Sequence, residues 1–422
     1  MRRWVVRFAL SLAVLAGVFI PMESAFAFTD VPGSYWDYTA ITYVAQTHTW
    51  MQDYGTQTFQ PTTLETRELY ARSLVNMYAP DEPIDPTIVI HDLPNTDPFY
   101  RYANVAIKLG WMPLWNSGNW GPTKAVKGDA VDRGVIAAMG VFTDAIKGLA
   151  NIHQNDGDPY VVDDFFPYIE LAHWMDFHYN HSDESQDVSR SSAFQRDEIA
   201  YTLWKAETAP SWQIDEASMF DTITLGKLDE TNATQALKQK MTQYALDQLG
   251  YPYIWGGEWN AKTGDGYCCG SQPQGGMDCS GFVWWTMKQN EGGYNAAQFH
   301  PDYKGWSLPQ RTSSDMAHNT SKQITFANLR IGDLMFFASD GGSSWSDVDH
   351  VGVYLGKNWM INSTGSGDGP LLDWVGDGYY YDIFVYARRI ISDSIGPQAP
   401  APLPANASAG DGPREGGERG DR

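Results

Sequence analysis

Apolar positions recur every three to four residues through the first half of the chain, which is the spacing of amphipathic helices. Three such segments end at a Trp-Met pair, at residues 50–51, 111–112 and 174–175. A second amphipathic segment then begins near Thr66, Asp132 and Gln195. Helix–loop–helix units that repeat in this way predict an all-α array in which each unit shields the apolar faces of its neighbours.

The second half of the chain combines helical and strand patterns. ALKQKMTQYALDQLG, from Ala236, predicts a helix that ends at Gly250. MDCSGFVWWTMKQ predicts a helix with Asp278 as its N-cap, and IGDLMFFAS, HVGVYLG and NWMINST predict three consecutive strands. These elements indicate an α+β domain with an antiparallel sheet over residues 233–392, which a polar connector at 209–232 joins to the helical part.

The composition narrows the classes of function. The formal net charge is −22, from 29 Lys and Arg against 51 Asp and Glu. This excludes a general nucleic-acid binder, because phosphate charge requires a basic surface, and it argues against docking on anionic membranes. The three cysteines are too few for a disulfide scaffold.

Both ends of the chain are expected to lie outside the folded domains. Residues 1–27 read as a secretory signal, because three arginines precede an apolar run and Ala25-Phe26-Ala27 fits a cleavage site. An uncleaved membrane anchor is the alternative. No later segment is apolar and long enough to span a bilayer, so we expect a protein secreted to the cell wall or cell surface, without membrane contact after signal cleavage. Residues 393–422 are rich in Pro, Ala and Gly and predict a disordered tail.

Three residues of the second half form a candidate catalytic set. Cys279 falls in the first turn of a helix, where the dipole and free N–H groups favour a thiolate and could hold an oxyanion. His350 begins one predicted strand and Asn362 lies in the next, and adjacent antiparallel strands can bring two such side chains together. The imidazole would take the thiol proton, so that the thiolate forms at a pH below the free thiol pKa of about 8.5. The amide would orient the ring.

These assignments have competitors. Cys279 could be a small buried apolar residue, as free cysteines often are. His318 or His300 could replace His350 as the base, although both lie in polar, loop-like surroundings without strand periodicity. A metal site is a further alternative in HWMDFHYNH, but helix surface and loop explain that stretch better, so no metal is predicted. Its histidines are His173, His178 and His181.

The first half resembles three S-layer homology (SLH) modules, over residues 28–83, 90–145 and 160–208. FTDVPGSYW is similar to the FxDV…YW opening of that family, and TRELYA at Thr66 and QRDEIA at Gln195 are similar to its TRAE motif. The resemblance implies a three-pronged helical assembly whose grooves bind pyruvylated secondary cell-wall polymer.

The same resemblance implies which residues bind the polymer. The motif arginine pairs with the ketal carboxylate, which suits the fixed fork of guanidinium donors. Arg67 and Arg196 sit at that position, and Arg133 is the best match in the second repeat, where no acid follows. We therefore expect one or two working grooves rather than three. The alternative is that these arginines only start helices and form surface ion pairs.

The second half resembles the NlpC-type papain-like cysteine peptidases of bacterial cell walls, from about residue 234 to 391. The matching motifs follow the order of that family: YPYIWGG, MDCSGF, LPQRTSSDM, LRIGDLMFF and DHVGVYLG. The resemblance implies Cys279 as nucleophile, His350 as base and Asn362 as the third polar residue. It also implies four residues that line the substrate site, of which the second and third would help to receive the free amine of the peptide: Tyr253, Asp278, Ser280 and Arg311.

The insertion 258–277, between WGG and DCSG, is the largest departure from that family and would extend the rim of the cleft. Cys268 and Cys269 lie in this Gly-rich segment without an activating helix start, so neither is the expected nucleophile. A regulatory disulfide between one of them and Cys279 is an alternative to two unreactive thiols.

Together, these features predict a secreted, wall-anchored cysteine endopeptidase that hydrolyses peptidoglycan stem peptides. By resemblance, the bond would join γ-D-glutamate to a diamino acid. No metal or organic cofactor is required. Two alternatives remain: a wall amidase or transpeptidase on the same scaffold, and a non-catalytic S-layer or wall-binding protein.

Overall fold

The computed structural model describes residues 28–51, 57–152, 160–177, 189–228, 232–259, 275–287, 308, 310–319, 322–365 and 369–391. The expected signal segment and tail therefore lie outside the described residues. Most of the insertion 258–277 also lies outside the described residues. So do five histidines and cysteines named in the sequence analysis: His178, His181, Cys268, Cys269 and His300.

The N-terminal part is helical, as the apolar spacing predicts. The side chain of Thr66 accepts a hydrogen bond from the Leu69 N–H at 3.4 Å, and Gln195 forms a capping box with Glu198, so two predicted helix starts are confirmed. The helices are α1 (Tyr38–Ile41), the π-helix η1 (Thr42–Thr47), α2 (Arg67–Tyr78), α3 (Tyr100–Lys108), α4 (Gly128–Met139), α5 (Thr143–Ala150), α6 (Phe166–Trp174) and α7 (Arg196–Thr208).

The loops before α2, α4 and α7 meet at one junction through two sets of three backbone hydrogen bonds, each of which links the three loops in a cycle and is called a ring below. In the first ring, the bonds are 2.9, 2.9 and 3.0 Å and run from the N–H of Glu65 to Phe194 O, from Val126 to Glu65 O and from Phe194 to Val126 O. In the second, they are 2.9, 3.1 and 3.0 Å and run from Arg67 to Lys124 O, from Gly128 to Ser192 O and from Arg196 to Thr63 O. The three loops therefore make equivalent contacts, and Arg67, Gly128 and Arg196 occupy equivalent positions.

The segment 209–232 differs from the polar connector that the sequence predicts. It contains α8 (Ser211–Glu216) and the 3-10 helix η2 (Ala217–Thr222). Phe220 is fully buried, and its ring stacks on Trp359 with centroids 5.4 Å apart. The side chains of Ala217, Ile223 and Leu225 are buried in the same core, so the connector is part of the folded body.

The C-terminal part is α+β with an antiparallel sheet, as predicted. Its helices are α9 (Ala233–Leu246), α10 (Cys279–Thr286), α11 (Ser313–Asn319) and α12 (Gly378–Asp382), with the short 3-10 helices η4 (Phe326–Asn328) and η5 (Trp345–Asp347). The strands β1 (Glu258–Trp259) and β2 (Gly276–Met277) pair with each other. The main sheet has the order β3-β8-β4-β5-β6-β7, with every pair antiparallel, from β3 (Gln323–Ile324), β4 (Leu334–Phe337), β5 (His350–Gly356), β6 (Trp359–Thr364), β7 (Gly369–Trp374) and β8 (Phe384–Arg388).

The three predicted strands are the neighbours β4, β5 and β6. The turn between β5 and β6 places Lys357 and Asn358 at φ values of 55° and 63°, the left-handed conformation that two-residue hairpin turns require. This tight turn fixes the register in which Asn362 lies opposite Gly352, two residues from His350.

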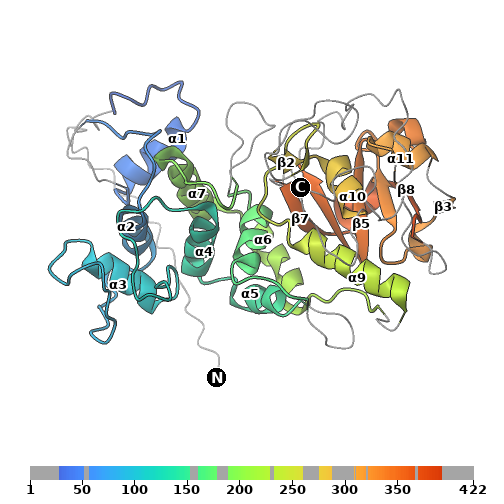
Figure 1. Cartoon of the computed structure of the whole chain (residues 1–422). Coiled ribbons are helices and arrows are strands. Elements are labelled where there is room, and N and C mark those ends of the chain that lie inside the picture. Colours follow the sequence, from blue (N-terminus) through green and yellow to red (C-terminus); the bar gives the residue numbers. More distant parts are fainter. Residues whose placement is uncertain are drawn as a thin grey trace, which may run out of the picture.

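The helical part and the sheet share one core. Figure 1 shows α5 and α6 between the outer helices and the sheet; α10 packs on β5 and β6, and α9 contacts α10. One cluster of buried apolar side chains includes Ile41 of α1, Leu171 of α6 and Tyr386 of β8. No helix among the described residues has both the length and the apolar character needed to cross a membrane.

Candidate active site

The start of α10 places Cys279 at a helix N-terminus, which confirms the sequence prediction. Asp278 is the N-cap, and its Oδ1 accepts a hydrogen bond from the Gly281 N–H at 2.5 Å. All eight residues of the helix are buried, so its apolar side chains fasten it to the core. The nucleophile candidate is therefore held at a fixed position in the fold.

The surroundings of Cys279 combine burial with local hydrogen bonds. The side chain is fully buried, and the backbone N–H groups of Val351 and Ser280 donate toward the sulfur. Burial raises the pKa of the Cys279 thiol well above its ordinary value, and the negative charge of Asp278 adds to this, whereas the hydrogen bonds and Arg311 lower it. The thiolate expected from the helix dipole is thus not the resting form, because loss of solvation outweighs the helix terminus.

His350 and Asn362 meet across β5 and β6. The His350 Nε2 lies 2.6 Å from the Asn362 Oδ1, and the Tyr380 hydroxyl donates to the same oxygen at 3.2 Å. The half-buried imidazole has a lowered pKa because burial outweighs the hydrogen bond that the ring donates to Asn362 and the charge of Asp349. Since an amide oxygen only accepts, Nε2 carries the proton of the neutral ring and Nδ1 keeps the lone pair.

The sequence prediction is therefore met in part. The pair His350–Asn362 forms at hydrogen-bond distance, and the sulfur of Cys279 is placed against the backbone of Val351, the residue that follows His350. The contact between the sulfur and the imidazole stays a prediction.

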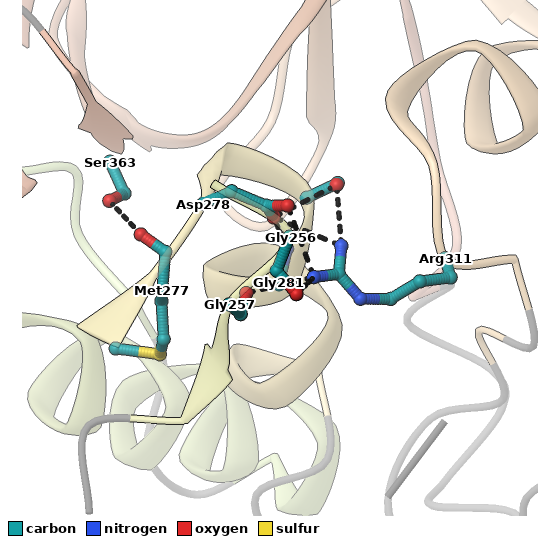
Figure 2. A network of polar contacts seen from close by, with 8 residues as sticks. Gly256, Gly257, Met277, Asp278, Gly281, Arg311 and Ser363 are labelled. Carbon is teal, nitrogen blue, oxygen red and sulfur yellow. Dashed lines mark hydrogen bonds and ion pairs between the residues drawn. The ribbon is translucent and has the colours of Figure 1, made fainter. Parts of the chain in front are cut away.

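A buried network around Arg311 holds the beginning of α10 (Figure 2). The Arg311 Nη1 donates to Asp278 Oδ1 at 2.9 Å and to Ser280 Oγ at 2.7 Å. Its Nη2 donates to Asp278 Oδ2 at 3.1 Å and to the carbonyl oxygens of Gly256 and Gly257 at 3.1 and 2.8 Å. One guanidinium thus joins the WGG segment, the N-cap and the first turn of the helix.

This network changes the interpretation of three predicted substrate-binding residues. Asp278, Ser280 and Arg311 are each at most 3% exposed, and their polar groups bind one another. Their contacts give them a positioning role toward Cys279, and their reception of a substrate amine stays a prediction. Tyr253 is also buried, and the neighbouring Pro252 O accepts from the Met277 N–H at 3.2 Å.

Two contacts at this site escaped the sequence prediction. The Ser363 Oγ donates to the Met277 carbonyl at 2.8 Å and ties β6 to the strand before α10 (Figure 2). The Asn362 Nδ2 donates to Asp373 Oδ2 at 2.8 Å. Asp373 lies in β7, which no motif indicated; its only signal is a single acid within an otherwise apolar strand, GPLLDW.

One competing base, His318, and one histidine of the metal alternative, His173, lie among the described residues. The exposed His318 stacks on Trp345 with ring centroids 4.1 Å apart. His173 is buried in α6. Within the described ranges, no three His, Cys, Asp or Glu side chains are grouped so that they could hold a metal ion.

Arg67 and Arg196 are buried at equivalent positions of the helical part. The Arg67 Nε donates to Trp120 O at 2.8 Å, with its guanidinium over the ring of Trp120 at 5.2 Å. The Arg196 Nε donates to Phe59 O at 2.8 Å, and its Nη1 forms a 2.7 Å ion pair with Glu65. Burial lowers the pKa of Arg67 to about 10, so it stays charged at neutral pH. Surface ion pairs, the alternative weighed above, do not describe these side chains.

The assignment of Arg133 as the third counterpart is wrong. The backbone rings place Gly128, five residues before Arg133, at the position of Arg67 and Arg196. Arg133 instead lies over the rings of Phe165 and Tyr168 at 5.8 and 5.4 Å. It lines a separate cavity of about 360 Å³.

A cysteine at a helix start, packed on an antiparallel sheet that carries a His–Asn pair, defines a papain-like domain. Residues 250–389 match the model of the NlpC/P60 family, so this part of the chain is an NlpC/P60 domain. The match covers the candidate catalytic set and leaves the helical part outside.

Curated relatives match part of the chain. Murein DD-endopeptidase MepH of Escherichia coli (strain K12) is 31% identical over 166 residues, 38% of this chain and 50% of that protein. Bifunctional muramidase/DL-endopeptidase CwlT of Bacillus subtilis (strain 168) is 28% identical over 204 residues, 48% of this chain and 50% of that protein. Gamma-D-glutamyl-L-lysine dipeptidyl-peptidase of Bacillus subtilis (strain 168) is 30% identical over 169 residues, 39% and 46% of the two chains. The chain spans about half the length of these relatives.

Proposed function

We propose that this chain is a cysteine endopeptidase that hydrolyses peptidoglycan stem peptides. The observation that carries the proposal is the 2.6 Å contact of His350 and Asn362 on the strands beside the helix start that bears Cys279. The NlpC/P60 match and the endopeptidase names of the relatives support it.

The proposed mechanism follows from the protonation of the site. Burial keeps the thiol of Cys279 and the imidazole of His350 neutral, so His350 Nδ1 takes the thiol proton as the sulfur attacks the peptide carbonyl. Backbone N–H groups at the start of α10 would stabilise the tetrahedral oxyanion. The imidazolium then protonates the leaving amine, and His350 activates the water that hydrolyses the thioester. These steps require no cofactor.

The proposed bond joins γ-D-glutamate to a diamino acid. One relative carries a γ-D-glutamyl-L-lysine specificity in its name, whereas two others are named DD- and DL-endopeptidases. The specificity therefore rests on the motif resemblance, with reception of a free amine near Asp278 and Ser280.

Digestion of defined muropeptides by the full chain tests this function. Wild type should release products cut after γ-D-glutamate, identified by mass spectrometry, and Cys279→Ala should lose at least about 1,000-fold in rate. The double variant Cys268→Ser/Cys269→Ser is the control and should keep its activity. Undiminished cleavage by Cys279→Ala would contradict the proposal. Cleavage of the sugar–peptide amide, or cross-link formation, would instead indicate the alternative amidase or transpeptidase.

We further propose that the helical part is a set of three SLH-like modules that anchors a secreted enzyme to wall polymer. The two backbone rings and the equivalent burial of Arg67 and Arg196 support this. Because a lysine lacks the guanidinium fork, Arg67→Lys and Arg196→Lys should each weaken binding to purified wall polymer by about fivefold or more, whereas Arg133→Lys should not. Equal effects of all three substitutions would contradict this assignment. If wild type trims wall no better than Cys279→Ala, with both at the background of untreated wall, while binding persists, the chain is a wall-binding protein without catalysis.

A further inference from the structure

The amide of Asn362 has two orientations that differ in which end faces His350. With Oδ1 toward the ring it accepts the Nε2 proton, whereas with Nδ2 toward the ring it would force the proton onto Nδ1. Only the first orientation leaves Nδ1 free to act as the base. Something behind the amide must therefore decide between them.

The group behind the amide is the carboxylate of Asp373. The Asn362 Nδ2 donates to Asp373 Oδ2 at 2.8 Å, and Asp373 is only 6% exposed. A carboxylate in its ionised form has no proton to donate, so in that form Asp373 accepts a hydrogen bond from Nδ2 and repels Oδ1. The Leu371 carbonyl, at 3.5 Å from the same Nδ2, adds a weak preference of the same sign.

We propose that Asp373 is a positioning residue of the catalytic site, which fixes the amide of Asn362 and through it the Nε2–H tautomer of His350. Asp373 acts on the ring through the amide of Asn362. The chain of contacts runs from Asp373 of β7 through Asn362 of β6 to His350 of β5, across three neighbouring strands. This inference rests on the proposed function only for its effect on rate.

The strand that carries Asp373 is itself held in place. Leu372, the preceding residue, donates its N–H to both carboxylate oxygens of Glu170, at 3.0 and 3.3 Å. The Tyr380 hydroxyl, from α12, donates a second hydrogen bond to Asn362 Oδ1, the oxygen that faces the ring. Each end of the Asn362 amide thus has a partner that favours the observed orientation: Asp373 at Nδ2 and Tyr380 at Oδ1.

The test compares Asp373→Asn with Asp382→Asn, an exposed acid at the end of α12. An asparagine at 373 can either accept or donate, so it no longer decides the orientation. Nitrogen-15 NMR of the imidazoles, with the His350 signals assigned by their loss in His350→Gln, should show Nε2–H in wild type and Asp382→Asn. In Asp373→Asn, a substantial Nδ1–H population should appear. A ring that stays entirely Nε2–H overturns the inference.

Kinetics on the muropeptide provide the second arm. Asp373→Asn should lower kcat by about tenfold or more, with KM changed less than twofold, since only the base is affected. In an Asn362→Ala background the same substitution should have little further effect on kcat, because the amide through which Asp373 acts is absent. Full additivity of the two substitutions overturns the inference. A wild-type protein that cleaves no muropeptide refutes the proposed function, while the NMR arm still decides the role of Asp373.

Discussion

Glu170 of α6 reaches from the helical part to the edge of the catalytic sheet, where its two carboxylate oxygens accept the N–H of Leu372 at 3.0 and 3.3 Å. β7 is the last strand of the sheet, so on its outer side this N–H has no strand partner. An unpaired edge group would be costly to bury, and Glu170 satisfies it. The wall-binding candidate and the hydrolase candidate are therefore joined by a specific buried contact.

Replacement of Glu170 should weaken the contact between α6 and β7. Glu170→Ala leaves the Leu372 N–H buried without its acceptor and should lower the free energy of unfolding by about 1–3 kcal/mol, measured by urea denaturation. Glu170→Gln keeps one acceptor oxygen and should cost less. Glu207→Ala, at an exposed position near the end of α7, is the control. Equal stability of Glu170→Ala and this control would show that the contact contributes nothing.

Arg311 should matter more for stability than its expected substrate role would suggest. Arg311→Leu removes the guanidinium and leaves Asp278 buried without its ion-pair partner, so we expect a loss of about 3–5 kcal/mol. Arg311→Lys keeps the charge but not the fork, so it should fold better and still lose activity as α10 shifts. Thermal unfolding and muropeptide cleavage measure the two effects. Arg330→Lys, on the surface, is the control. A fully active Arg311→Lys would refute the role of the fork.

The titration of Asp37 should contribute to the pH dependence of the free energy of unfolding. Burial, and then the charge of Asp197, raises the pKa of Asp37 to about 9 from an ordinary value of 3.8. The folded chain therefore keeps a proton that the unfolded chain releases, so the free energy of unfolding falls as pH rises from about 4 to about 9 and then levels. The slope from this group is at most about 1.4 kcal/mol per pH unit.

Asp37→Asn tests this directly. Urea denaturation at about pH 5 and about pH 8.5 should give a smaller loss of stability in the variant than in wild type. A residual slope should remain, because burial also raises the pKa of Glu65 to about 7, despite its ion pair with Arg196. Asp81→Asn, exposed in a loop, should leave the wild-type slope unchanged. Identical slopes for Asp37→Asn and wild type would refute the assignment.

The sequence predicted those parts of the site that depend on local pattern. A helix that begins at Cys279 follows from its N-cap and apolar run, and the His350–Asn362 contact follows from two strands and a tight turn. The pKa of Cys279 could not be predicted from the local pattern. A helix start favours the thiolate, but the burial that raises the pKa of Cys279 depends on how distant segments cover it.

Contacts between distant segments could not be predicted. The role of Gly128 emerges only from the backbone rings, since a glycine carries no motif and Arg133 matches Arg196 in its distance from the preceding Trp-Met pair. Asp373 and Glu170 lie in β7 and α6, whose proximity depends on how the two parts pack. Periodicity along one segment contains no information about the segment opposite.

Gly281 provides a test of how rigidly α10 is seated. A Cβ at this position would lie 2.2 Å from the Gly257 carbonyl oxygen and 3.0 Å from Arg311 Nη2. Alanine in a helix interior normally gains about 1 kcal/mol over glycine. Here the backbone oxygen cannot yield, so Gly281→Ala should push α10 away from the WGG segment and lower both stability and muropeptide cleavage. Gly33→Ala has open space around its Cβ and is the matched control. If Gly281→Ala melts at or above the wild-type temperature with full activity, the contact between α10 and Gly257 does not set the position of Cys279.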